Sequence, residues 1–336
     1  MKKRILSCLM ALALCLTLLP ATAQAEDGHQ THPICGKTCS HTGEMPHPDA
    51  FENAKWLTSA LGTDSSSQVL RVDSGNGSID GEPVGGDSSV DGWLLPEGAY
   101  YLKGEGSGKE VTIDQPIVIR SKVTICLNGM TLQSKGTKSV NPVFLIEDNG
   151  ELTLTDCKNG GKVTRFSNND SRGSGVQVNS GTFNLYGGAI TRNKADYGGG
   201  VLVTSGTTFN MYGGSITDNE ATGEGFGGGG VCVKGGTFNM HGGTIAANRA
   251  TIYTGQGNGG GVSVVDGGKF EMNGEATSVS NNTASDNGGG VYVLDNGTFT
   301  MNSSTASVTG NTADQGGGVY ASHGDFIVSG GTITDN

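Results

Sequence analysis

The stretch "GGGVCVKGGTFNMHGGTIAANRA", residues 228–250, decides the fold, because close copies of it follow one another along much of the chain. Each copy reads GGGVxV, then GTFxM, then GGxIxxNxA. The first valine of each copy recurs at intervals of 25 to 31 residues, at Val176, Val201, Val231, Val262, Val291 and Val319. A period in this range is typical of repeat architectures, in which each unit packs against its neighbours.

Apolar and polar residues alternate within each copy, and helical spacing is absent from the repeats. Two apolar columns share one face and are separated by mainly polar residues. They are Phe183, Phe209, Phe238, Phe270, Phe299 and Phe326, and Leu185, Met211, Met240, Met272, Met301 and Val328. A period of two with one apolar face indicates β-strands.

One unit has too few apolar residues to form a core, and stacking the units solves this problem. Stacked coils pair their backbones about 4.8 Å apart and place Phe on Phe, Met on Met and Val on Val. We therefore predict an all-β fold, a right-handed parallel β-helix of three sheets, over residues 93–336. Weaker coils at 123–132 and 143–164 keep the strands but lose the glycine triplets.

These units resemble the right-handed parallel β-helix family within the pectate-lyase-like superfamily. The pairing of GGGV with IxxNxA is similar to the short repeats of bacterial polymorphic outer-membrane and adhesin-type proteins. The resemblance covers six clear units from about residue 173 to the end. It is specific for architecture and not for activity.

Two polar positions recur in the units, and we interpret both as structural. A catalytic residue is needed once, whereas the third strand is followed by an asparagine in every unit. We expect these residues to form a hydrogen-bonded ladder at a corner where the backbone is left-handed. They are Asn193, Asn219, Asn248, Asn282, Asn311 and Asn336. His241 alternates away from Met240, so we expect it to face solvent without a role in a site.

A lyase of the family that these repeats resemble would need calcium-binding carboxylates and an Arg or Lys on one face, above long loops. Asp196, Asp286 and Asp314 each precede a glycine triplet by two residues, and Arg192 and Arg249 lie beside the asparagine column. We interpret the aspartates as solvated corners and do not predict a calcium site. The loops between coils are short, which leaves little wall for a substrate cleft.

The first 25 residues predict a secretory signal peptide. A basic start is followed by an apolar run from Ile5 to Leu19 and by small residues before an expected cleavage site at Glu26. We therefore predict a secreted or cell-surface protein. No stretch approaches the roughly 20 apolar residues of a membrane span.

The chain carries 32 acidic against 21 basic residues, a formal net charge of −11. An acidic chain repels phosphate backbones, so nucleic acid is not an expected partner. Carbohydrate or another host or cell-surface ligand is the partner class that we predict.

Residues 26–47 form a Cys/His-rich segment with four candidate ligands, His32, Cys35, Cys39 and His41. The Cys-x3-Cys spacing is within the range of zinc sites, and histidines flank the pair. In an oxidising compartment Cys35 and Cys39 could instead form a disulfide. Both interpretations stay open, with zinc as the predicted cofactor.

Three further cysteines lie in the β-helix. Cys232 alternates away from Val231 and Val233, so we expect an outward, unpaired thiol. Cys126 and Cys157 are about one coil apart but about two positions out of register, so a bridge between them is possible but not predicted.

Residues 48–92 are predicted to cap the first coil and to link it to the segment before it. Phe51, Ala54, Leu57 and Leu61 follow Pro48 at helical spacing, which favours a helix over 48–62. Residues 63–92 are rich in Ser, Gly and Asp and read as a linker. The sequence stops partway through a coil at 336, so we expect the β-helix to continue beyond it.

Two classes of function fit these observations. The leading hypothesis is a scaffold or adhesin-like surface that contacts glycans without catalysis. The alternative is a polysaccharide lyase or glycoside hydrolase acting on acidic polysaccharide. The near-identity of the coils favours the scaffold, because an active site is unique.

Overall fold

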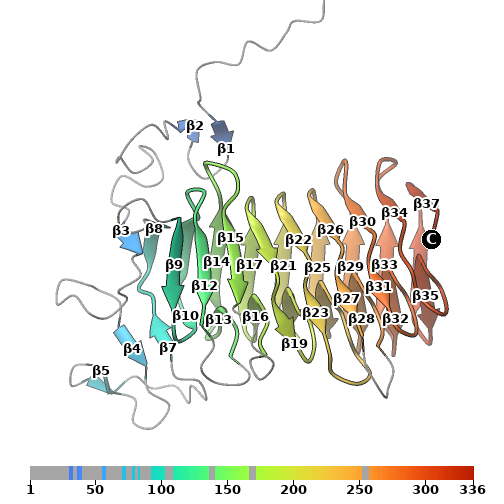
Figure 1. The fold of residues 1–336 in the computed structure, drawn as a ribbon, viewed down its shortest axis with the longest axis horizontal. Helices are drawn as coiled ribbons and strands as arrows, with labels where there is room; N and C mark the ends of the chain where they lie inside the picture. Colours follow the sequence, from blue (N-terminus) through green and yellow to red (C-terminus); the bar gives the residue numbers. More distant parts are fainter. Residues whose placement is uncertain are drawn as a thin grey trace, which may run out of the picture.

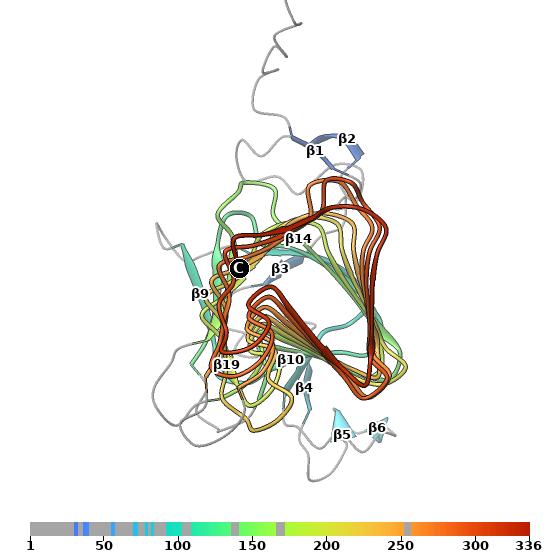
Figure 2. The ribbon, with the colours of Figure 1, turned by 90° about the vertical axis from the view of Figure 1, so that its right-hand side faces the viewer.

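The structure, a computed structural model, describes residues 92–102, 109–135, 141–165, 172–251 and 257–336 and the backbone of short strands between residues 30 and 83. Every regular element in these ranges is a β-strand. The strands stack in chain order along the long axis of the molecule (Figure 1). Viewed down that axis, successive coils repeat one cross-section (Figure 2). The protein is therefore a parallel β-solenoid, and the predicted all-β fold class is confirmed.

Three sheets of ten, ten and nine strands form its sides. The valine sheet contains β4 (Leu70–Val72), β7 (Gly92–Leu94), β10 (Ile117–Ile119), β13 (Phe144–Ile146), β16 (Val176–Val178), β20 (Val201–Val203), β24 (Val231–Lys234), β28 (Val262–Val265), β32 (Val291–Leu294) and β35 (Val319–Ser322). The phenylalanine sheet contains β3 (Lys55–Leu57), β8 (Gly98–Leu102), β11 (Lys122–Cys126), β14 (Gly150–Thr155), β17 (Gly181–Leu185), β21 (Thr208–Met211), β25 (Thr237–Met240), β29 (Lys269–Met272), β33 (Thr298–Met301) and β36 (Asp325–Val328).

The isoleucine sheet contains β9 (Glu110–Ile113), β12 (Thr131–Ser134), β15 (Lys162–Arg165), β18 (Ala189–Thr191), β22 (Ser215–Thr217), β26 (Thr244–Ala246), β30 (Ser278–Ser280), β34 (Ser307–Thr309) and β37 (Thr332–Thr334). A fourth, short sheet was not predicted; it contains β19 (Lys194–Ala195), β23 (Glu220–Ala221), β27 (Arg249–Ala250) and β31 (Thr283–Ala284). Two antiparallel pairs precede the solenoid, β1 (Gln30–His32) with β2 (Gly36–Cys39) and β5 (Ser78–Ile79) with β6 (Glu82–Pro83).

The register of the repeats agrees with the columns expected from the sequence. Val201 pairs with Val231, and Phe209 pairs with Phe238. The phenylalanine rings from 183 to 326 stack on one another with centroids 4.5 to 5.2 Å apart. Both columns, apart from the partly buried Val319 and Phe326 of the last coil, belong to one buried core cluster that also includes the column methionines and the isoleucines. Like residues stacked in this way exclude water from the interior of every coil.

The predicted asparagine ladder is present, and all of its residues except the last, Asn336, are buried. Asn248 Nδ2 donates to Oδ1 of Asn282 on the following coil at 3.0 Å and to the carbonyl oxygen of Ile216 on the preceding coil at 2.9 Å. Asn248 Oδ1 accepts hydrogen bonds from the backbone N–H and the Nδ2 of Asn219, each at 3.0 Å. Bonds from Nδ2 to Oδ1 of 2.8–3.0 Å connect Asn193, Asn219, Asn248, Asn282, Asn311 and Asn336 in order.

The glycine triplets are part of the same arrangement. A methyl group at Gly230, the third glycine of its triplet, would approach Asn248 Nδ2 to 2.9 Å and the carbonyl oxygen of Gly261 to 2.7 Å. A methyl group at the equivalent glycines 175, 200, 261, 290 and 318 would meet the ladder asparagine of the same unit in the same way. Glycine is therefore required there because the ladder amide occupies the space of a side chain, and GGGV and IxxNxA form one packing unit.

The left-handed corner lies one residue earlier than predicted. The ladder asparagines do not have positive φ; the residues before them do. These are Arg192 (57°), Asp218 (56°), Ala247 (55°), Asn281 (54°), Gly310 (66°) and Asp335 (55°). The ladder residue instead turns its amide into the interior, so its identity is fixed by hydrogen bonding and the corner tolerates several residue types.

The prediction of a helix over residues 48–62 is wrong at Lys55–Leu57. These residues form β3, which pairs in parallel with β8. The unpaired backbone groups at the edge of β8 offer a hydrogen-bond ladder, which competes with the weak helical pattern. The rest of the segment lies outside the described residues.

We expect Asn248→Ala to lower the free energy of unfolding by about 3 kcal/mol, because it leaves buried donors of Asn219 without acceptors. Chemical denaturation measures this loss. The control is Asn302→Ala, at an exposed position where only one side-chain bond, to Asn273 at 2.7 Å, is lost; its cost should stay within about 0.5 kcal/mol. Equal costs for the two variants would contradict a structural role for the ladder.

We expect Gly230→Ala to cost more than about 2 kcal/mol, because the added methyl group overpacks the ladder. Gly267→Ala is the matched control: its methyl group would meet nothing within 4 Å, but the residue has a φ of 76°. That variant should lose only the cost of left-handed backbone, about 1 kcal/mol. If the two losses are the same, overpacking against the ladder amide is not what selects glycine at 230.

Candidate functional site

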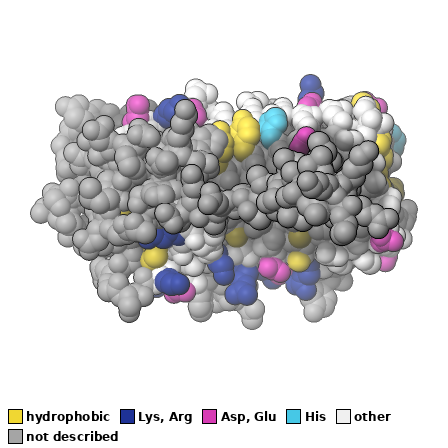
Figure 3. Space-filling model, turned by 90° about the horizontal axis from the view of Figure 1, so that it is seen from above, with side chains coloured by type: hydrophobic (Ala, Val, Ile, Leu, Met, Phe, Trp, Pro, Cys, Tyr) yellow, Lys and Arg dark blue, Asp and Glu magenta, His cyan; other side chains and the backbone are white. Residues whose placement is uncertain are grey.

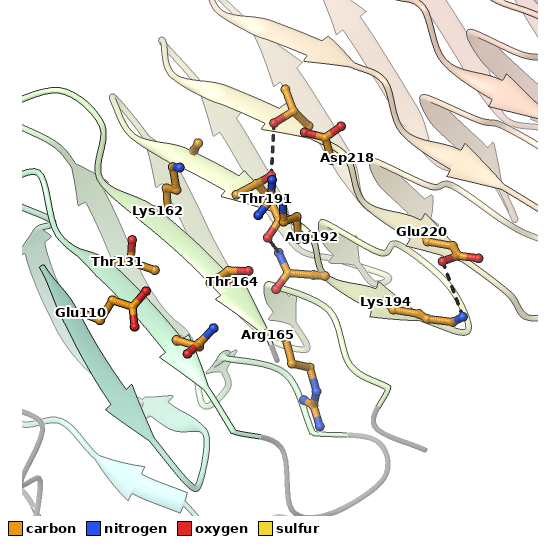
Figure 4. A pocket seen from close by; sticks show the side chains of 14 residues that line it. Glu110, Thr131, Lys162, Thr164, Arg165, Thr191, Arg192, Lys194, Asp218 and Glu220 are labelled. Carbon is orange, nitrogen blue, oxygen red and sulfur yellow. Dashed lines mark hydrogen bonds and ion pairs between the residues drawn. The ribbon is translucent and has the colours of Figure 1, made fainter. Parts of the chain in front are cut away.

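A groove of about 580 Å³ lies on the outer face of the isoleucine sheet, across β12, β15, β18 and β22 (Figure 4). This volume is within the range of ligand sites in proteins. Strand alternation builds its floor: Leu132, Val163 and Ile190 enter the core, and the residues beside them face outward. The floor contains Thr131, Gln133, Thr164, Thr191 and Thr217.

Charged side chains surround this floor. The cations are Lys162, Arg165, Arg192 and Lys194, and the carboxylates are Glu110, Asp218 and Glu220. Lys194 Nζ lies 3.5 Å from Glu220, which also pairs with Arg249 at 3.4 Å. No carboxylate of the described residues is within ion-pair distance of Lys162 or Arg192. These two exposed cations are therefore available to a ligand.

Arg165 differs from the other cations because it is buried, with 3% of its surface exposed. Burial lowers the pKa of its guanidinium below the usual value, although arginine remains charged in proteins. A side chain at Gly173 would collide with this guanidinium, so a glycine makes room for it. The buried cation is a fixed positive charge beside the threonine floor.

Asn193 is the first residue of the ladder and also lines the groove. Its Nδ2 donates to Asn219, but its Oδ1 has no hydrogen-bond partner among the described residues. Later ladder residues receive two hydrogen bonds at this atom from the coil before them, for example Asn219 from Asn193. The ladder thus begins with an unused acceptor where the groove lies.

The lining defines the chemistry that the groove can support. Hydroxyl and amide groups form the floor, cations outnumber carboxylates, and no aromatic residue is among the described lining residues. Such a surface suits a hydrophilic ligand that carries many hydroxyl groups and negative charge, because each group finds a complementary partner. It does not suit an apolar ligand, which needs apolar walls.

The structure separates the acidic and basic candidates that a lyase would combine. Arg192 lies in the groove, and Asp196 forms an ion pair with Arg172 at 2.7 Å. Asp286 and Asp314 lie on neighbouring coils beyond the groove, where the N–H of Gln315 donates to the carbonyl oxygen of Asp286. Among the described residues no group of three or more His, Cys, Asp or Glu side chains could hold a metal ion.

The predicted zinc ligands are not part of the groove or of the solenoid strands described above. The side chains of His32, Cys35, Cys39 and His41 are outside the described residues, as is the signal peptide of residues 1–25. Zinc, or a disulfide between the two cysteines, remains a prediction.

His241 is exposed, as predicted, but it has a partner that the sequence did not reveal. Its ring stacks on Tyr212 with centroids 4.9 Å apart, and Tyr212 stacks on Tyr186 at 4.5 Å. The three rings therefore stack face to face on successive coils. Seen from above, the described surface carries small hydrophobic and histidine groups, and Lys, Arg, Asp and Glu side chains lie among them and along its edges (Figure 3).

Cys232 is a free thiol, as predicted, but the structure buries it. The residue does alternate away from the core, yet its exposed fraction is 0%. The glycine triplet before each valine strand folds back over the outer face of that strand: a methyl group at Gly228 would lie 2.9 Å from Cys232 Cα. This cover also buries Ser263 and Tyr292 in the same column. Burial raises the pKa of the Cys232 thiol from 9.0 to about 12.

No protein-family model, curated protein or solved structure matches this chain. The geometry itself therefore defines the class of protein, a parallel β-solenoid with a polar, cation-bearing groove on one sheet. Within the described part of the chain, no helix is long and apolar enough to cross a membrane.

We expect thiol reagents to leave Cys232 unmodified in the folded protein and to modify it after unfolding. Its folded pKa lies above the unfolded value, so it contributes stability below pH 9 that is lost as pH rises toward 12. Cys232→Ala should therefore show a smaller loss of stability between pH 8 and pH 10 than the unaltered chain. Peptide mapping measures labelling, and urea unfolding measures stability; rapid labelling of the folded chain would contradict the burial.

Proposed function

We propose that this chain is a secreted or cell-surface β-solenoid scaffold whose groove binds carboxylated glycans without catalysing a reaction. The observation that carries the proposal is the set of cations, Lys162, Arg165, Arg192 and Lys194, around a floor of threonine hydroxyls. The resemblance of the repeats to pectate-lyase-like and adhesin-type β-helices supports glycan contact as the class of function.

The direction of the groove supports a chain-like ligand. Its floor crosses successive coils, which are spaced about 4.8 Å apart, close to the length of one sugar residue in an extended glycan. Thr164, Thr191 and Thr217 present hydroxyls on consecutive coils, and Thr217 Oγ1 donates to Thr191 Oγ1 at 3.4 Å. A glycan lying along the solenoid axis could therefore meet an equivalent hydroxyl on each coil.

Charge favours a glycan over a nucleic acid. Double-stranded DNA carries one charge per about 1.7 Å of axis, so a chain with a net charge of −11 repels it strongly. A uronate glycan carries at most one carboxylate per sugar, and its carboxylates can pair with Lys162 and Arg192. The local cations then outweigh the weaker repulsion by the rest of the molecule.

A lyase or hydrolase is the alternative function. Arg192 is available in the groove as the basic group that such an enzyme needs. The aspartates that were its candidate calcium ligands, Asp286 and Asp314, lie on coils beyond the groove. The scaffold is favoured for this reason, and an assay for product tests the choice.

We expect the full chain to bind polygalacturonate at low ionic strength and to bind a neutral glucan at least about tenfold more weakly. Lys162→Glu and Arg192→Glu should each lower the affinity for polygalacturonate by about tenfold, the loss of one charge-assisted contact. Isothermal titration calorimetry measures both affinities, and added salt should weaken only the charged ligand.

Lys269→Glu is the matched control, because it makes the same change of charge at an exposed position on the phenylalanine sheet. Its affinity should stay within about twofold of the unaltered chain. Equal losses of affinity for the groove variants and the control variant would show that the groove is not the binding site. Failure of the chain to bind any uronate glycan would overturn the proposed function. Release of unsaturated products or new reducing ends would instead establish the enzymatic alternative.

A further inference from the structure

Cys126 and Cys157 meet in the structure although the sequence register places them two positions apart. Their Sγ atoms are 2.7 Å apart, and both residues are buried, with exposed fractions of 0% and 1%. Cys126 ends β11, where it pairs with Thr155 at the end of β14. Cys157 follows Thr155 by two residues, so the chain must fold back to bring the sulfurs together.

Asp156 provides the turn that does this. Its carboxylate accepts the N–H of Gly129 at 2.7 Å and the N–H of Gly161 at 2.6 Å. These bonds tie the corner after β14 to the corner after β11, one coil earlier, and they hold Cys157 over the end of β11. The turn explains why counting positions along extended strands did not predict the contact.

We propose that Cys126 and Cys157 form a disulfide that joins two successive coils. Each thiol loses its hydrogen, the two sulfurs form one covalent bond, and two electrons and two protons pass to a disulfide oxidant such as oxidised glutathione, which becomes two thiols. The buried position requires this oxidation to occur before the coils have closed completely.

The position of the bond complements the asparagine ladder. The ladder begins at Asn193, so the coils of β11 and β14 lie before its first residue. Those coils also lack the glycine triplets of the later repeats. A covalent link between residues 31 positions apart would hold these coils in register before the first described rung of the amide ladder.

To test this proposal, the full chain is folded in a glutathione redox buffer, and its free thiols are then alkylated under denaturing conditions without reductant. The peptides are mapped by mass spectrometry. We expect one cross-linked peptide pair containing Cys126 and Cys157, which disappears on reduction, and an alkylated Cys232. Alkylation of both Cys126 and Cys157, or a cross-link of either to Cys35 or Cys39, would overturn the proposal.

A stability measurement complements the mapping. Reduction of the unaltered chain should lower its melting temperature by several degrees. The double variant Cys126→Ser with Cys157→Ser should respond to reduction less than the unaltered chain does, and Cys232→Ala should respond to reduction as the unaltered chain does. A cross-link that forms without any uronate binding would leave this proposal standing while overturning the proposed function.

Discussion

The side-chain amide of the ladder asparagine is the interaction on which the rest of the solenoid depends. One amide bonds to the coil before it and to the coil after it, and all of its donors and its acceptor are used in the interior. A coil that slipped by one residue would leave several of these buried groups without partners, at a cost of about 1–3 kcal/mol each. The ladder therefore fixes the register that the stacked apolar columns alone would hold less strictly.

The candidate site follows from where this ladder begins. Among the described residues the repeating contacts stop on one side of Asn193, and the coil before it contributes Lys162 and Arg165 to the groove. The corner beside the ladder is free to vary, since only its backbone conformation is required, and it places Arg192 and Asp218 at the groove. The constant ladder and the variable corner thus separate the residues that build the coil from those that can serve a ligand.

Much of the fold could be predicted because its signals are local and periodic. The columns through Val231 and Phe238 follow from alternation and spacing, and the buried ladder follows from a polar residue that every unit retains. The burial of Cys232 could not be predicted, since alternation tells which way a side chain points but not that a glycine segment covers it. The contact between the two cysteines depends on the turn at Asp156, and the groove depends on residues such as Arg165 that do not recur from coil to coil. A periodic sequence pattern therefore cannot predict either feature.

The third glycine of each triplet also has a consequence for how such a chain can change over generations. Because Gly230 fits Asn248 and Gly261 as Gly200 fits Asn219 and Gly230, the interface between coils is the same at each step of the repeats. An in-frame duplication or deletion of a whole unit would leave every remaining interface intact. Recombination among the units that follow Glu220 can therefore alter the length of the solenoid without a new packing arrangement in its core, and it leaves the residues that line the groove unchanged.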